Sequence, residues 1–187
     1  MPARPRTSTD AILAAGLELL ETGGVDAVTM QAIADRVGVR APSLYKRYVN
    51  RTALLAALAD AGFAEQAALF RRALRGGDAA ADVTRLANAY RDFAHRRPQM
   101  YRLLFLELGD GDEDATAARR AAAQPLLDLT ERLVGSERSL DAARLLTAFV
   151  HGFVSMELAG AFRLGGDVDR AYGYGVETLV AALARDV

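Results

Sequence analysis

Alanine and leucine recur at spacings of three and four residues along most of the chain, and no stretch alternates apolar and polar residues as a half-buried strand does. This periodicity predicts an all-α protein of about nine helices. The first helix is expected to begin in "TSTDAIL", because Thr9 or Ser8 can cap its free amides and Asp10 suits the first turn. The glycines of "TGG" at 22–24 are expected to end it.

The next helical pattern is short. In "TMQAIADRV" (29–37), apolar side chains follow the i, i+3, i+4, i+7 spacing of one buried face, between Thr29 as the expected cap and Gly38 as the expected end. Pro42 then suits the first turn of a third helix over about 41–48. Two short helices joined by a glycine-containing turn form a helix-turn-helix, whose second helix enters the major groove of DNA.

Longer helices are predicted for the rest of the chain. Their expected starts are near residue 50, at Asp78 or Asp82, after Pro98, near residue 114, at Ser136 or Ser139, and at Asp167. The helix that begins at Ser136 or Ser139 is expected to continue through "LAGAFRLGG" to residue 166. The change from short to long helices predicts two domains: a three-helix DNA-binding domain over residues 1–51, and a larger helical domain over residues 52–187.

Charge is balanced overall but not locally. The 187 residues include 23 Lys and Arg against 24 Asp and Glu, which argues against a general polyanion binder. The stretch "VGVRAPSLYKRYVNR" (37–51) nevertheless holds four cationic side chains and no acid. Because an acid on a DNA-facing surface would repel phosphate, this local excess favours a DNA-binding face.

Composition argues against disulfide-bonded, thiolate-metal and membrane-spanning proteins. The absence of cysteine excludes disulfides and thiolate metal sites. The longest uncharged run, residues 145–156, has 12 residues, which is short of the roughly 20 needed to span a bilayer. A cytoplasmic protein is therefore expected. His95 and His151 have no histidine or cysteine four residues away, so neither a metal site nor a cofactor is predicted.

Residues 10–58 resemble the N-terminal DNA-binding domain of TetR-family transcriptional regulators. The resemblance lies in the amphipathic first helix, in "GVDAVTMQAIADRVGVRAPSLYKRYVNRTALLAAL", and in the direct run into the next helix. Two later segments, "YRDFAHRRPQMYRLLFLE" (90–107) and "FVHGFVSMELAGAF" (149–162), resemble the WHG-type effector domain of one branch, although Phe149 stands where that branch has Trp. The resemblance implies a homodimeric repressor that a small molecule releases from its DNA operator. It also implies that the larger domain, residues 52–187, is a ligand-binding and dimerisation domain.

This reading assigns DNA contacts around the helix-turn-helix. Backbone phosphates are expected at the hydroxyl of Thr29 and at Tyr45, Arg47 and Arg51, and base edges at Lys46. The full predicted set is Thr29, Gln31, Arg40, Ala41, Pro42, Ser43, Tyr45, Lys46, Arg47 and Arg51. Leu44 and Tyr48 are expected to face inward, and Ser43 outward with the two cations at 46 and 47. Arg4 and Arg6 form either a basic arm or a disordered end.

Aromatic residues recur at helical spacing in the C-terminal part, where they are either plain core or the lining of a cavity. The resemblance implies a small-molecule pocket formed by Tyr90, Phe93, Tyr101, Phe105, Phe149, His151, Phe153 and Met156. Since few charges fall among them, a largely apolar ligand is expected, anchored by His151 or a tyrosine hydroxyl. His151 can equally be a hydrogen-bonded core residue. The last two long helices, which contain Gly152, Gly160, Gly173 and Gly175, are expected to form the dimer interface.

Two other functions compete with the repressor. One is a small all-α enzyme that uses His151 or His95, although no nucleophile, base and acid set accompanies either histidine. The other is a helical adaptor or DNA-binding protein without sequence preference, which salt dependence without site preference would reveal.

Overall fold

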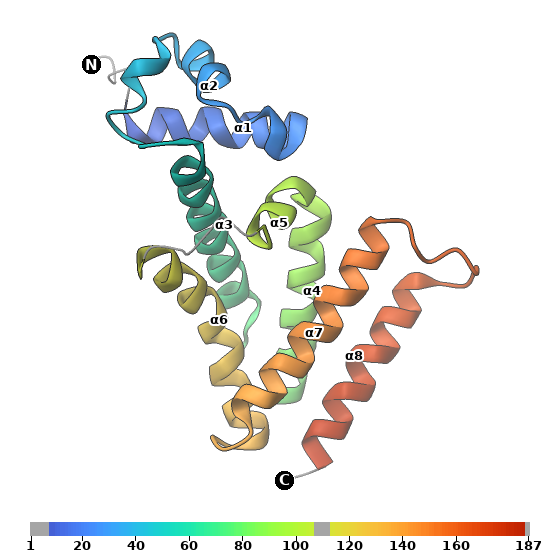
Figure 1. Cartoon of the computed structure of the whole chain (residues 1–187). Coiled ribbons are helices and arrows are strands. Elements are labelled where there is room, and N and C mark those ends of the chain that lie inside the picture. Colours follow the sequence, from blue (N-terminus) through green and yellow to red (C-terminus); the bar gives the residue numbers. More distant parts are fainter. Residues whose placement is uncertain (1–7, 107–112, 186–187) are drawn as a thin grey trace. The chain divides into compact units, whose positions relative to one another are not determined.

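The computed structural model describes residues 8–106 and 113–185, and all regular structure within these residues is helical (Figure 1). Eight α-helices and one 3₁₀ helix follow one another, which confirms the all-α class and the expected count. They are α1 (Thr9–Ala27), α2 (Met30–Val37), η1 (Ala41–Ser43), α3 (Arg51–Ala73), α4 (Ala79–Arg96), α5 (Pro98–Leu104), α6 (Glu113–Val134), α7 (Ser139–Leu158) and α8 (Val168–Arg185).

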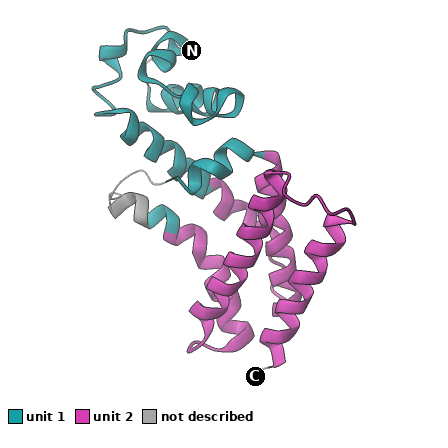
Figure 2. Cartoon of the chain, turned by 45° about the vertical axis from the view of Figure 1, so that its right-hand side comes forward, with its two compact units in different colours: residues 1–64, 97–119 teal, residues 65–96, 120–187 magenta. Residues whose placement is uncertain are grey.

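The chain forms two compact units, coloured separately in Figure 2. Unit 1 contains residues 1–64 and 97–119, and unit 2 contains residues 65–96 and 120–187. The boundary therefore falls inside α3, and α3 contributes to the core of both units.

Local capping chemistry defines α1 and α2 as predicted. The Ser8 hydroxyl accepts from the Ala11 amide at 3.2 Å, and the Thr29 hydroxyl accepts from the Ala32 amide at 3.1 Å. Gly38 ends α2 in the left-handed conformation at φ 73°, which residues with a Cβ rarely adopt. At the end of α1, Gly24 breaks the helix with φ 72°, and a further turn then follows to Ala27.

The third helix is shorter than predicted. Instead of a continuous helix over 41–48, the chain forms the 3₁₀ turn Ala41–Ser43 and then hydrogen-bonded turns. The Ser43 and Leu44 amides reach back three residues, and only the Tyr48 amide reaches back four, to the Leu44 carbonyl at 3.0 Å. A helix this short is unstable by itself. Leu44 is the only fully buried side chain of residues 41–48. Its packing is therefore the main tertiary contact that stabilises this short segment.

Unit 1 is built around α3. Its first amides are capped by Asn50, whose side chain accepts from the Ala53 amide at 2.8 Å. Gly16 of α1 lies against Leu58, where a Cβ would come within 3.1 Å of the leucine side chain. Among the described residues, α3 is also the one helix long and apolar enough to cross a membrane, and its burial explains that composition, since Leu54, Leu55 and Leu58 are core residues.

In unit 2, α4 buries one apolar stripe, formed by Val83, Leu86, Tyr90 and Phe93. Of the two predicted starts of this helix, Asp78 and Asp82, the structure has the cap at Asp78. Asp78 accepts from the Ala81 amide at 3.0 Å as a cap.

Asp82 itself lies inside unit 2. Its carboxylate accepts from the Arg75 amide at 2.8 Å and from Arg85, and these hydrogen bonds lower its pKa. This buried carboxylate therefore closes the turn between α3 and α4.

The hairpin of α7 and α8 differs from the prediction at its ends. Ser139 is not an exposed cap: its hydroxyl is buried and lies 3.0 Å from that of Thr130. α7 ends at Leu158, because Gly160 turns the chain with φ 63°, and it does not continue to residue 166. Along α8, the buried residues are Tyr172, Val176, Val180 and Leu183.

Candidate functional site

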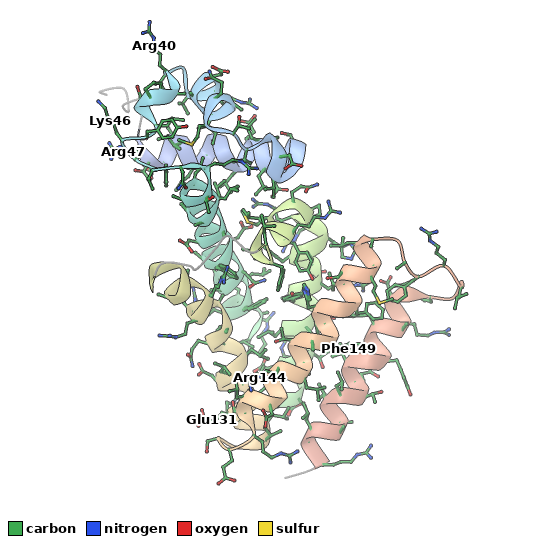
Figure 3. The ribbon with its side chains drawn as sticks, viewed as in Figure 1. Arg40, Lys46, Arg47, Glu131, Arg144 and Phe149 are labelled. Carbon is green, nitrogen blue, oxygen red and sulfur yellow. The ribbon has the colours of Figure 1, made fainter. Side chains whose placement is uncertain are left out.

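The cationic stretch forms an exposed surface of unit 1. Arg40, Lys46 and Arg47, here called the cationic ridge, are all exposed, and Figure 3 shows their side chains extending away from the helices of unit 1. Tyr45 lies among them with 53% of its surface exposed. The predicted cluster of cations is therefore exposed on unit 1.

Buried neighbours orient the ridge. Leu44 is fully buried and Tyr48 is half-buried, so the three residues between them point outward. Burial raises the pKa of the Tyr48 phenol, although the charge of Arg47 opposes the rise. Ser43 is half-buried rather than fully outward, because the segment forms a 3₁₀ turn instead of the expected helix.

The predicted contacts on α2 are exposed but already hydrogen-bonded. Thr29 uses its hydroxyl oxygen as the helix cap, which leaves its proton available as a donor. Gln31 donates from Nε2 to the Asp35 carboxylate at 2.7 Å, so it must leave that partner before it can bind a base. Arg4 and Arg6 lie outside the described residues.

Arg51 is held inside unit 1. Its Nε donates to the Val28 carbonyl at 2.7 Å and its Nη2 to the Val25 carbonyl at 2.6 Å. Both carbonyls follow the break in α1, and that of Val25 also accepts from the Val28 amide at 3.1 Å. The guanidinium therefore ties the start of α3 to the link between α1 and α2. Arg51 thus has a structural role in unit 1 in addition to its predicted phosphate contact, which stays a prediction.

The predicted aromatic pocket is divided between the two units. Tyr101 and Phe105 belong to unit 1, where their rings are 5.2 Å apart. The other six, Tyr90, Phe93, Phe149, His151, Phe153 and Met156, belong to unit 2. Of these, Phe93 is core, Met156 is about half exposed, and the ring of Phe149 covers Gly175 of α8.

A polar pair joins two of the unit 2 residues. The Tyr90 hydroxyl lies 3.2 Å from Nδ1 of the half-buried His151. Burial lowers the pKa of His151 below its ordinary value, so the imidazole is neutral at pH 7. His151 is therefore both hydrogen-bonded and partly accessible, which leaves its two predicted roles open.

Unit 2 also carries a pocket of about 370 Å³ beside the α7–α8 connection. Its aromatic walls are Phe153, Phe162 and Tyr174, and Arg170 lies among its lining residues. Only Phe153 belongs to the predicted set. Phe162 and Tyr174 were missed because one lies in a loop and the other outside the buried stripe of α8.

A charged cluster on α4, α7 and α8 was also missed. Arg91 pairs with Glu157 and, at 2.6 Å, with Asp169, and its guanidinium lies 4.8 Å from the ring centre of Tyr172. His95 reaches the same Glu157 at 2.9 Å. The hydrogen bond from Arg91 is the main reason that the pKa of Glu157 is lowered. No spacing rule identifies partners 66 and 78 residues apart.

Comparison with known proteins agrees with this arrangement. Residues 12–58 match the model of bacterial regulatory proteins of the tetR family, and residues 83–179 match the tetracyclin repressor-like C-terminal domain. An HTH-type transcriptional regulator of Mycobacterium tuberculosis is 31% identical over 161 residues, covering 84% of this chain and 74% of the relative. The class A tetracycline repressor from transposon 1721 of Escherichia coli is 30% identical over 171 residues, covering 87% and 74%.

Solved structures give the same result. A protein of unknown function from Rhodococcus sp. RHA1 has a TM-score of 0.83 at 25% identity, covering 98% of this chain and 97% of that one. A TetR variant from Acinetobacter baumannii AYE, in complex with minocycline, has a TM-score of 0.70 at 25% identity, covering 95% and 97%. The relatives are regulators, so an enzyme using His151 or His95 is not favoured, nor is a non-specific adaptor. The chain belongs to the TetR family of DNA-binding transcriptional regulators.

Proposed function

We propose that this chain is a homodimeric, cytoplasmic repressor that binds a double-stranded DNA operator through unit 1 and leaves it when a small, largely apolar molecule binds unit 2. The observation that carries the proposal is the cationic ridge. Three cations of one short segment point outward while Leu44 of the same segment is fully buried. A surface with this charge and this rigid support suits a groove lined by phosphates.

Within the proposed interface, contacts divide into those that position the protein and those that read bases. Thr29, Arg40, Tyr45 and Arg47 bind the phosphate backbone. Lys46 donates to guanine in the major groove. Gln31, Ala41, Pro42 and Ser43 complete the base-facing set, in which Gln31 pairs with adenine and the apolar surface of Ala41 and Pro42 meets a thymine methyl group.

The proposed dimer interface is the outer face of α7 and α8. Gly152 and Gly173 support it, because nothing lies within 4 Å of a Cβ added at either position, which leaves room for a partner helix. Leu145, Met156 and Tyr174 are large apolar residues exposed on the same two helices. A two-fold dimer presents two recognition segments to half-sites about 34 Å apart or a multiple of that distance.

The proposed effector site lies in unit 2, among the predicted aromatic residues that this unit contains. Two relatives point to the same behaviour: one is named as a tetracycline repressor and the other was solved with minocycline. The segment from Phe149 to Phe162 supports a WHG-type effector domain. We assign DNA binding to residues 1–51 and effector binding with dimerisation to residues 52–187.

Coupling between the two functions requires an element that both share. α3 is continuous from Arg51 to Ala73 and contributes to both units. A ligand that favours a different position of α3 would shift the dimer away from its DNA-bound arrangement, and DNA would weaken ligand binding by the same factor.

The test is fluorescence anisotropy with the DNA upstream of the protein's own gene and with selected sites. Arg47→Ala should weaken binding to all sites alike and reduce the salt dependence by about one counterion. Lys46→Ala should instead change site preference, by about 5- to 150-fold at one base pair. Arg120→Ala is the matched control, since Arg120 is exposed on α6 in unit 2. Binding without salt dependence and without site preference would refute the proposal.

A further inference from the structure

One buried side chain of unit 2 lacks the hydrogen bond that its burial requires. Gln66 of α3 is only 6% exposed, and its Nε2 has no partner. Among the described residues it is the one buried side-chain nitrogen or oxygen in this condition. Because a buried amide loses its hydrogen bonds to water, an unpaired one is rare in folded proteins and requires an explanation.

Gln66 is connected through Phe70 to two other polar side chains of unit 2. Gln66 precedes Phe70 by four residues, so the two lie one turn apart on the same face of α3. The ring of Phe70 stacks on that of Tyr90 at 6.2 Å, and the Tyr90 hydroxyl contacts Nδ1 of His151. Three helices therefore contribute an amide, a phenol and an imidazole that are connected through the buried ring of Phe70.

Only one of these three polar groups lacks a protein partner. Tyr90 and His151 are hydrogen-bonded to each other, whereas the amide nitrogen of Gln66 is not bonded to any group. Desolvation keeps His151 neutral at pH 7, and neither an amide nor a phenol is charged there. The region thus offers a hydrogen-bond donor without a charge, which suits a neutral ligand with an acceptor oxygen.

We infer that Gln66 is a specificity-determining residue of the effector site, where its amide donates a hydrogen bond to a carbonyl oxygen of a neutral and otherwise apolar effector. This inference rests on the proposed effector site in unit 2. It adds Gln66 to that site and defines the chemical class of the ligand.

The unpaired amide nitrogen of Gln66 would make the site selective among ligands of similar shape. A ligand with a carbonyl oxygen pairs with the amide, whereas a hydrocarbon of the same shape displaces any water there and leaves the donor unpaired. Sites built around such a donor reject ligands that lack the matching group. Replacing Gln66 should therefore reduce the affinity for the carbonyl ligand and leave the affinity for the hydrocarbon of the same shape nearly unchanged.

The experiment compares tetralin with 1-tetralone, which share a bicyclic frame and differ by one carbonyl oxygen. Dissociation constants are measured by ligand-observed NMR for the wild-type dimer, for Gln66→Met and for Gln124→Met. Methionine keeps the length and helix preference of glutamine but has no donor. Gln124 is the control because it is exposed on α6 and its Nε2 already donates to Asp128 at 2.7 Å.

The wild type and Gln124→Met should bind 1-tetralone about tenfold more tightly than tetralin, the factor expected for one additional hydrogen bond. In Gln66→Met the ratio should fall to about one, with tetralin binding retained. A wild-type ratio near one, or an unchanged ratio in Gln66→Met, overturns the inference and leaves the effector site standing. If neither probe binds up to its solubility limit, the effector site fails together with the inference.

A measurement on the wild type covers the case in which Gln66→Met does not fold. The side-chain amide signals of Gln66 in a ¹H–¹⁵N spectrum should shift on addition of 1-tetralone and remain in place with tetralin. Equal response to both probes contradicts a hydrogen bond from Gln66 to the carbonyl.

Discussion

The hydrogen bond of the Tyr172 hydroxyl joins α8 to α4, and its contribution to stability can be measured with one substitution. Tyr172 is only 1% exposed, and its hydroxyl donates to the Ala87 carbonyl at 2.6 Å. Replacement by phenylalanine removes this oxygen and leaves the ring, with Phe153 at 5.2 Å and the Arg91 guanidinium at 4.8 Å. The change therefore tests one buried hydrogen bond and little else.

The expected cost follows from what remains after the change. The Ala87 carbonyl lies inside α4, so it retains the helical bond from the amide four residues on and is not left unpaired. Tyr172→Phe should then reduce the free energy of unfolding by about 1 kcal/mol, the net value of one such bond. For a chain of this size the melting temperature should fall by roughly 2–4 °C.

The assay is urea unfolding followed by circular dichroism at one fixed protein concentration, since stability depends on concentration in a dimer. Tyr174→Phe is the matched control, because Tyr174 lies on the same helix with 71% of its surface exposed. It should unfold at the wild-type midpoint. If Tyr172→Phe also unfolds at that midpoint with an unchanged m-value, the buried hydrogen bond does not contribute to stability and the reasoning is refuted.

The same variant predicts a difference at alkaline pH. Burial raises the pKa of Tyr172 above its ordinary value of about 10, with the charge of Arg91 opposing the rise. A raised folded-state pKa contributes stability that is complete below the unfolded-state value and is lost as the pH rises above it. Wild-type stability should therefore decline above about pH 10, and the decline should be smaller in Tyr172→Phe than in Tyr174→Phe.

Three further predictions test other parts of the structure. Arg51→Met should lower the free energy of unfolding by about 1–2 kcal/mol by removing two hydrogen bonds to carbonyls, while the salt dependence of DNA binding stays at the wild-type value, as anisotropy can measure. Gly38→Ala should cost about 1 kcal/mol in chemical unfolding because of its φ of 73°, whereas Gly77→Ala, in open space without a positive φ, should cost nothing. The lowered pKa of Glu157 contributes stability above its unfolded-state pKa, and this stability is lost as the pH falls. Glu157→Gln should therefore lose less stability than the wild type below about pH 4. Equal free energies of unfolding against pH in the two proteins would contradict this.

Features that depend on neighbouring residues could be predicted from the sequence. The caps at Ser8 and Thr29 and the glycine end at Gly38 follow from local hydrogen bonding and backbone sterics, and all three are present. The buried stripe of α4 could be predicted because helical period and apolar spacing together define one face. Fold class and the exposure of the cationic ridge rest on such local rules.

Features that depend on distant partners could not be predicted. Arg91 meets Glu157 and Asp169 only because α4, α7 and α8 pack together. The burial of Gln66 likewise depends on its neighbours in space, since a single glutamine in an alanine-rich helix suggests a solvated position. The third helix was predicted too long because Pro42 and apolar spacing favour a helical start but do not specify how far the helix continues.

Arg47 and Arg51 show that the charge pattern of a sequence does not distinguish an exposed arginine from one that is bonded within the protein. Both are arginines of the same basic stretch, four residues apart, and charge alone assigns both to phosphate. Their surroundings separate them, because Arg51 donates to the Val25 and Val28 carbonyls after the break at Gly24, whereas Arg47 is exposed. A guanidinium that satisfies backbone carbonyls releases no counterion from DNA, so the salt dependence of binding should fall in Arg47→Ala and not in Arg51→Met. The basic stretch therefore contains both the proposed DNA-facing surface and, at Arg51, the residue that ties the start of α3 to the link between α1 and α2.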